Sequence, residues 1–365
     1  RTEDGSYAGT FLAPWQEGEL QMSFAGDTLQ GSAADGAFAG SVSGHRVDSV
    51  QPIRDYGAAI EAFDEVVATK IFAPEDLDSA GYQQFREVFG EISAAAQDDI
   101  DMLLGFHLAW KNDPFSHFQL RRSPQSAKEM FSYFDNYRVG FEAATVEIDD
   151  RVAVLKVRTM MGADTIEQIE AAYDRIAESD VETLIIDLRG NGGGAFAVKP
   201  LVEHIIDEPF DTGYFLSQVW NRENDRLPTY EEVLSAQPWE GWSIVAFWEA
   251  VQSERIMRIR MHPAEPNFDG DVYVLVDKVT ASAAEMAADA LRASGVATLI
   301  GERTAGEMLS QSMFDVVDGF VVTLPVADYY SMRHGRIEGQ GVSPHVGSSS
   351  EAALNVARER AGATE

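Results

Sequence analysis

Short apolar runs of strand character alternate with amphipathic helical segments through the second half of the chain. The strand-like runs are 144–157, which a tight turn at Asp149–Asp150 divides, 181–194, 270–277 and 296–301. The helical pattern recurs in 163–179, 198–207 and 282–294. Because strands and helices that alternate in this way bury their apolar sides against each other in layers, we expect an α/β core.

Two other patterns precede this core. Residues 1–50 are rich in Gly, Ser and Ala with alternating apolar positions, which predicts a small β unit. From Tyr56 onward apolar residues recur at three and four positions, so 51–137 is predicted as a helical subdomain that carries Ser116 and His117. The core is expected over 138–365. Its rhythm is broken at about 208–269 by an aromatic-rich segment, interpreted as an insertion that covers a cleft or packs as a helical hairpin.

Composition excludes several functions. The 365 residues include 28 Lys and Arg against 60 Asp and Glu, a net charge of −32, which repels nucleic acid and anionic membranes. The absence of cysteine excludes thiol catalysis, thiolate metal sites and disulfides. No apolar run reaches the roughly 18 residues of a membrane span. Because the chain begins at Arg1, we expect a removed leader and an exported protein, periplasmic or extracellular.

Ser282 lies where an apolar run gives way to a helical pattern. A serine hydroxyl at such a junction is a candidate nucleophile, because the first helical turn offers unpaired N–H groups, here that of Ala283, to a developing oxyanion. It still needs a base to take its proton. The alternative is that Ser282 only caps the helix, which is a common role for serine.

The run "DLRGNGGG" at 187–194 follows an apolar strand. Consecutive glycines let the backbone approach a ligand and direct N–H groups at it, so Gly192 and Gly193 are candidates for the other oxyanion donor. The alternative is a tight strand-to-helix turn, held by Asp187 and Arg189.

Three further residues are candidates for the proton-transfer machinery. His117 is one of seven histidines, and a neutral imidazole is the usual base near pH 7. Ser116 beside it is placed to orient the ring. Glu338, in "GRIEGQGVSPH", is one candidate among many carboxylates for the group that fixes the base.

Three segments, in this order, resemble the core of the C-terminal processing (tail-specific) serine peptidase family: "VETLIIDLRGNGGG", "VYVLVDKVTASAAEMAADALRASGVATLIGERTAGE" and "IEGQGVSPH". The tricorn core protease and the interphotoreceptor retinoid-binding protein modules belong to the same family. The resemblance covers about 140–348. It implies a ClpP/crotonase-like core, Ser282 as nucleophile, and an oxyanion hole of the Ala283 N–H and a loop glycine, Gly193 above all.

The resemblance also points to the base. Processing peptidases of this family use a Ser–Lys dyad, but "GERTAGE" carries Glu307 at the place of that lysine. The tricorn-like branch instead pairs a Ser–His from an earlier segment with a late glutamate before "GV-x-P". By this resemblance Ser282 attacks, His117 takes and returns the proton, and Ser116 orients His117. Glu338 acts through Ser116 or nearby polar groups, without necessarily touching the histidine. Lys278 is interpreted as a surface residue.

The expected activity is that of a serine peptidase acting on unfolded or short peptides through an acyl-enzyme, without metal or cofactor. Too few residues separate His117 from the first core strand to hold the PDZ domain usual in processing peptidases, which leaves recognition of a free C-terminus open. Two alternatives remain: a non-catalytic module that binds apolar ligands, like the retinoid-binding relatives, and an esterase with the same machinery. A peptide or protein is the expected partner, and no oligomeric state is predicted.

Overall fold

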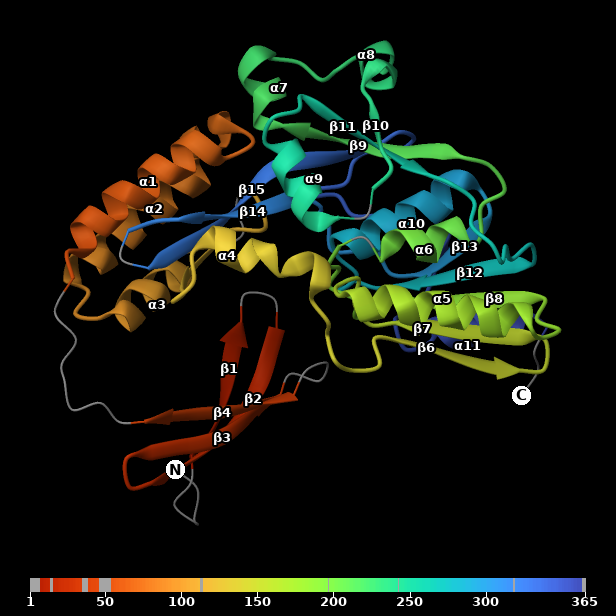
Figure 1. The fold of residues 1–365 in the computed structure, drawn as a ribbon, viewed down its shortest axis with the longest axis horizontal. Helices are drawn as coiled ribbons and strands as arrows, with labels where there is room; N and C mark the ends of the chain where they lie inside the picture. Colours follow the sequence, from red (N-terminus) through yellow and green to blue (C-terminus); the bar gives the residue numbers. More distant parts are fainter. Residues whose placement is uncertain are drawn as a thin grey trace.

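The computed structural model describes residues 7–13, 16–34, 39–45, 54–111, 114–195, 197–241, 243–317 and 319–362 (Figure 1). Its first element is a four-stranded antiparallel sheet in the order β1-β2-β3-β4. These strands span Tyr7–Ala13, Gln16–Ala25, Thr28–Ala34 and Ala39–His45. The boundary predicted between residues 50 and 51 lies outside the described residues, and the division of the chain into three units stays a prediction.

The helical segment gathers at one end of the molecule (Figure 1). It contains α1 (Tyr56–Lys70), the 3-10 turn η1 (Pro74–Asp78), α2 (Ala80–Ala95) and α3 (Asp99–Ala109). Side-chain oxygens of Asp55, Ser79 and Asp98 cap the three α-helices, as the free N–H groups of a first turn require. The helices enclose an aromatic cluster in which the Phe63 ring contacts Phe85, Phe89, Phe106 and Phe118.

The core sheet has six strands in the order β17-β13-β12-β8-β7-β6. They span Val346–Gly347, Ala297–Gly301, Asp271–Val276, Thr183–Asp187, Val152–Val157 and Ala144–Asp149. All neighbours are parallel except β6 and β7, which form the predicted hairpin. Helices α5 (Ala163–Ala177), α6 (Val198–Glu203) and α10 (Ala283–Ser294) cover one face, and α11 (Ala353–Arg360) packs on the other. The α/β prediction is confirmed.

A second sheet has seven strands. Its order is β10-β11-β9-β15-β14, and β5 and β16 also pair with β15. These strands span Pro238–Trp239, Ile256–Met261, Phe210–Ser217, Phe320–Ser331, Ser310–Asp315, Gln119–Arg122 and Gly335–Arg336. The aromatic-rich segment 208–269 therefore supplies three strands of this sheet. Between them run α7 (Gln218–Glu223), α8 (Tyr230–Ser235) and α9 (Ile244–Val251).

Helix α4 (Ala127–Ser132) and the 3-10 turn η2 (Phe134–Asn136) follow β5. The Phe131 and Phe134 rings lie 4.8 and 5.1 Å from that of Trp248 in α9. These aromatic contacts join the end of the segment 51–137 to the segment 208–269. Within the described part of the chain, no helix combines the length and apolar character needed to cross a membrane.

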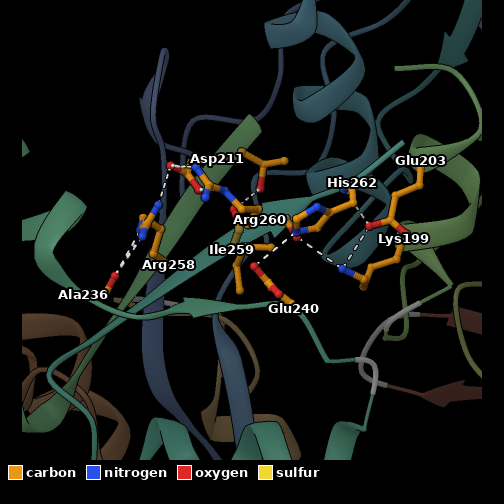
Figure 2. Close-up of polar contacts among 10 residues, drawn as sticks. Lys199, Glu203, Asp211, Ala236, Glu240, Arg258, Ile259, Arg260 and His262 are labelled. Carbon is orange, nitrogen blue, oxygen red and sulfur yellow. Dashed lines mark hydrogen bonds and ion pairs between the residues drawn. The ribbon is translucent and has the colours of Figure 1, made fainter. Parts of the chain in front are cut away.

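Charged side chains fasten the second sheet to core helix α6 (Figure 2). The partly buried Asp211 carboxylate accepts from Arg258 Nη1 at 2.6 Å and from Arg260 Nε at 3.0 Å. The ammonium of Lys199, on α6, donates to the Arg260 carbonyl at 3.2 Å and pairs with Glu203 at 3.0 Å. One acidic residue thus neutralises two arginines on β11, the strand that α6 contacts.

Substitution Asp211→Ala is expected to lower the free energy of unfolding by about 3 kcal/mol, because it leaves the buried Arg258 guanidinium without a counter-charge. Urea unfolding followed by circular dichroism measures this change. The matched control is Arg151→Ala, which breaks the exposed pair with Glu182 and should cost less than about 1 kcal/mol. Equal effects of the two substitutions would contradict the assignment of Asp211 as the counter-charge that stabilises β9 against β11.

Candidate active site

Ser282 occupies a strained turn between β12 and α10. Its backbone has φ 54° and ψ −124°, and it is one of three described non-glycine residues with positive φ. The turn is held by Asp277, whose Oδ1 accepts the N–H groups of Gly190, Val279 and Thr280 at 3.0–3.1 Å. Strain of this kind costs free energy and persists only where surrounding contacts impose it, as at functional sites.

A buried carboxylate on α10 supports that turn. Glu285 accepts the N–H of Ser282 at 3.1 Å, and its side chain also accepts the N–H groups of Gly306 and Glu307 at 2.8 and 2.9 Å. Burial raises the pKa of Glu285, against the opposing effect of these donors. Sequence reasoning missed this residue, although its position three residues after Ser282 has the spacing of a capping box.

His117, Ser116 and Glu338 form one hydrogen-bonded chain. The Ser116 hydroxyl lies 2.6 Å from Nδ1 of His117. The Glu338 carboxylate accepts the Ser116 N–H on Oε1 at 3.1 Å and the Met308 N–H on Oε2 at 2.6 Å. His117 itself has φ 58°, a second strained position. The structure therefore brings together three predicted residues that lie up to 222 positions apart in the sequence.

Burial shifts the pKa values of His117 and Glu338, the two titrating groups of this hydrogen-bonded set. It lowers the pKa of His117 to about 4, because a partly buried imidazole loses the hydration that favours its charged form. It raises the pKa of Glu338 to about 7, although the hydrogen bonds from Met308 and Ser116 act in the opposite direction. At neutral pH the His117 ring is uncharged and able to accept a proton.

One cavity joins this chain to the serine. Its volume is about 120 Å³, and His117, Ser282, Ala283 and Gly194 all line it. The remaining lining is largely apolar, from Phe131, Phe134, Met161, Phe215, Ile244, Phe247, Trp248, Met286, Met308, Leu309 and Met313. Among the described residues, no hydrogen bond links Ser282 to His117. The two side chains line the same cavity but are not hydrogen-bonded to each other.

Two backbone donors are open beside Ser282. In the described part of the chain, the N–H groups of Ala283 and Gly194 have no hydrogen-bond acceptor, and both residues line the cavity. The Gly193 N–H, in contrast, donates to Asn191 Oδ1 at 2.9 Å. Gly192 does not belong to the described lining of the cavity. The sequence favoured Gly193, whereas the described glycine-loop N–H that lacks an acceptor and also lines the cavity is that of Gly194.

Gly193 has another role, because its backbone lies directly against the serine turn. A Cβ at this position would lie 2.7 Å from both the Ala281 carbonyl oxygen and Ser282 Cβ. The φ of Gly193 is 92°, which L side chains rarely adopt. Only glycine allows the two loops to approach this closely.

The remaining sequence candidates lie outside this cluster. Lys278 is exposed and is not part of the cavity lining, and Glu307 contributes its backbone N–H to Glu285. His345 exchanges hydrogen bonds with Leu299, where its Nδ1 accepts the Leu299 N–H at 3.0 Å. In the ranges that the structure describes, no group of three His, Asp or Glu side chains is arranged to hold a metal ion.

Substitution Gly193→Ala is expected to displace the Ser282 turn, because the new methyl group overlaps Ala281 and Ser282. The rate of labelling by a serine-reactive fluorophosphonate should fall by at least about tenfold, the equivalent of roughly 1.4 kcal/mol in the barrier. The control is Gly90→Ala in α2, where a methyl group meets no atom within 4 Å. A Gly193→Ala protein that labels as fast as this control would contradict the close approach of the two loops.

Comparisons with known proteins find similarity to peptidases. The model of peptidase family S41 matches residues 151–348. A carboxyl-terminal-processing protease of Synechocystis is 25% identical over 227 residues, which are 62% of this chain and 43% of the relative. A carboxy-terminal processing protease of Bacillus subtilis is 26% identical over 198 residues, 54% of this chain and 35% of the relative. The chain therefore spans less than half the length of these curated relatives.

Solved structures share the fold. A lipoprotein from Streptococcus agalactiae aligns with a TM-score of 0.55 and 12% identity, covering 86% of this chain and 98% of its own. A protein from Parabacteroides merdae, described as a peptidase, aligns with a TM-score of 0.54 and 14% identity, covering 83% and 97%. The family match extends over more than half of the 365 residues, from β7 to the strand after the Glu338 loop, and includes the Ser282 turn. The chain belongs to peptidase family S41.

Proposed function

We propose that this chain is a serine peptidase that hydrolyses unfolded or short peptides through an acyl-enzyme on Ser282. Membership of a peptidase family supports a peptide or protein substrate. The observation that carries the proposal is the hydrogen-bonded chain Glu338–Ser116–His117, which ends at the cavity that Ser282 lines. Such an arrangement supplies a neutral base, a group that orients it and a nucleophile.

The first chemical step is attack by Ser282 Oγ on the scissile carbonyl carbon. His117 takes the hydroxyl proton on Nε2, because Nδ1 already faces the Ser116 hydroxyl at 2.6 Å. The carbonyl oxygen gains negative charge, which the Ala283 and Gly194 N–H groups stabilise at the positive end of helix α10. His117 then returns the proton to the leaving amine, which departs as the acyl-enzyme forms.

The second step releases the acid product. Water gives a proton to His117 and adds to the acyl carbon, and the second tetrahedral intermediate expels Ser282, which regains the proton. In both steps His117 carries a positive charge for a short time. Glu338 lowers the cost of that charge through Ser116, whose N–H donates to the carboxylate and whose hydroxyl lies 2.6 Å from Nδ1 of the imidazole.

We propose in addition that the protein acts after export. The curated relatives include a carboxyl-terminal-processing peptidase of Arabidopsis thaliana whose name places it in the chloroplast, 38% identical over 80 residues. The absence of cysteine from a 365-residue chain is compatible with an oxidising compartment.

Substitution Ser282→Ala is expected to abolish hydrolysis of a fluorogenic peptide library, and His117→Ala to lower kcat by at least about 100-fold, because the nucleophile and the base are lost. Lys278→Ala is the control and should leave hydrolysis unchanged, since this exposed side chain lies outside the cavity lining. Full activity in Ser282→Ala would rule out the mechanism.

The pH dependence of kcat/KM for a neutral ester should show two rises. The first, near pH 4, follows deprotonation of His117, whose pKa burial lowers. The second, near pH 7, follows ionisation of Glu338, whose pKa burial raises and whose negative charge favours the imidazolium. Substitution Glu338→Gln should remove the second rise and keep the first. A single rise near pH 6.5 in both proteins would contradict the two assignments.

A further inference from the structure

One arginine lines the cavity. Arg121, on β5, lines the cavity together with Thr323 on β15 and Met313 on β14. Its guanidinium donates from Nη2 to the Thr323 hydroxyl at 2.6 Å. Its Nε is buried and has no acceptor among the described residues. A fork of five donors is therefore partly enclosed in the cavity wall with one side-chain acceptor.

No carboxylate neutralises this arginine in the described part of the chain. It forms no ion pair there, and burial lowers the pKa of its guanidinium with no counter-charge acting against it. Its neighbour Arg122 is different, because it pairs with Asp99 at 2.6 Å. In a chain with 60 acidic and 28 basic residues, an arginine that is half-buried and unpaired is unexpected. An unpaired buried charge costs free energy that a ligand can recover.

The surroundings of Arg121 select the sign of such a ligand. The described lining of the cavity contains two ionisable side chains, His117 and Arg121, and no carboxylate. His117 is uncharged at neutral pH. Arg121 is thus the one fixed charge of the described wall. The described lining thus carries a positive side chain and no negative one, although the protein as a whole carries −32.

Most of the remaining lining of the cavity is apolar. It includes aromatic rings from three elements: Phe131 on α4, Phe134 on η2, and Phe247 with Trp248 on α9. A cavity of this composition favours a large apolar side chain, and a fixed polar group in its wall sets the orientation of the ligand.

We infer that Arg121 is a specificity-determining residue that binds a carboxylate of the substrate while the apolar wall takes a neighbouring side chain. Guanidinium–carboxylate pairs are bidentate and directional, and they gain strength in a partly dry site. The carboxylate comes either from the free C-terminus of a peptide or from an internal Asp or Glu side chain. The inference rests on the proposed peptidase function, because it assigns the substrate class of the same cavity.

Binding to the Ser282→Ala protein separates this inference from the hydrolytic mechanism. Four peptides share one apolar sequence: free acid or amide at the C-terminus, and, with the C-terminus amidated, Glu or Gln at an internal position. Trp248 borders the cavity, so quenching of tryptophan fluorescence, checked by calorimetry, gives each Kd. At least one acid is expected to bind about 10- to 100-fold more tightly than its neutral partner.

Three further substitutions in the Ser282→Ala background assign this preference. Arg121→Gln should remove it, and Arg121→Lys should retain part of it, because an ammonium keeps the charge without the fork. Arg122→Gln is the matched control: it removes an adjacent arginine that pairs with Asp99, and it should keep the preference. Thermal unfolding confirms that each variant is folded, and if Arg121→Gln is not, Arg121→Lys and the parent protein decide.

A preference for the free acid identifies a C-terminal carboxylate as the ligand, and one for Glu over Gln identifies an internal acid; either supports the inference when Arg121→Gln abolishes it. Equal Kd values within both pairs in the parent protein would overturn it, as would a preference that survives in Arg121→Gln. A peptidase mechanism that fails, with activity retained in Ser282→Ala, leaves these binding results unaffected.

Discussion

The arrangement of the site depends on the two hydrogen bonds that the Glu338 carboxylate accepts. One oxygen accepts the Ser116 N–H and the other the Met308 N–H. A single buried side chain therefore joins the segment that precedes β5 to the loop that precedes β14. Because an isolated carboxylate in an apolar interior is costly, these donors fix its position, and its position fixes theirs. The ring of His117 follows, since its Nδ1 lies against the Ser116 hydroxyl. The proposed base, from the segment before the core, thereby lines the same cavity as the proposed nucleophile, from the core.

A second buried carboxylate, that of Glu285, holds the Ser282 turn. Glu285 joins the Ser282 N–H to the 304–307 loop, and Gly193 lets the glycine loop lie against the serine turn. Both Ser282 and His117 hold positive φ values that surrounding hydrogen bonds impose. The two strained residues line one largely apolar cavity, and a polar interaction in apolar surroundings is stronger than in water.

The α/β core was predictable because its apolar runs have lengths and periods that differ between strands and helices. Ser282 was identified from its strand-to-helix position, but His117 and Glu338 gained weight only through the family resemblance. Hydrogen bonds across 222 residues leave no local pattern. The choice of Gly194 as the proposed oxyanion donor was also not predictable from the sequence, since it depends on the hydrogen bond from the Gly193 N–H to the Asn191 side chain. Arg121 lies in no recognisable motif. It was not predictable from the sequence, because only the fold shows that no carboxylate lines the described cavity beside it.

A crystal structure of the protein inactivated by a fluorophosphonate tests most directly whether His117 serves Ser282. Phosphorus should be bonded to Ser282 Oγ, its oxygen should accept the N–H groups of Ala283 and Gly194, and His117 Nε2 should lie about 3 Å from Oγ or from the leaving-group position. Phosphorus on another side chain, or an imidazole turned away from the adduct with the Ser116 contact broken, would contradict the assignment of His117 as the base.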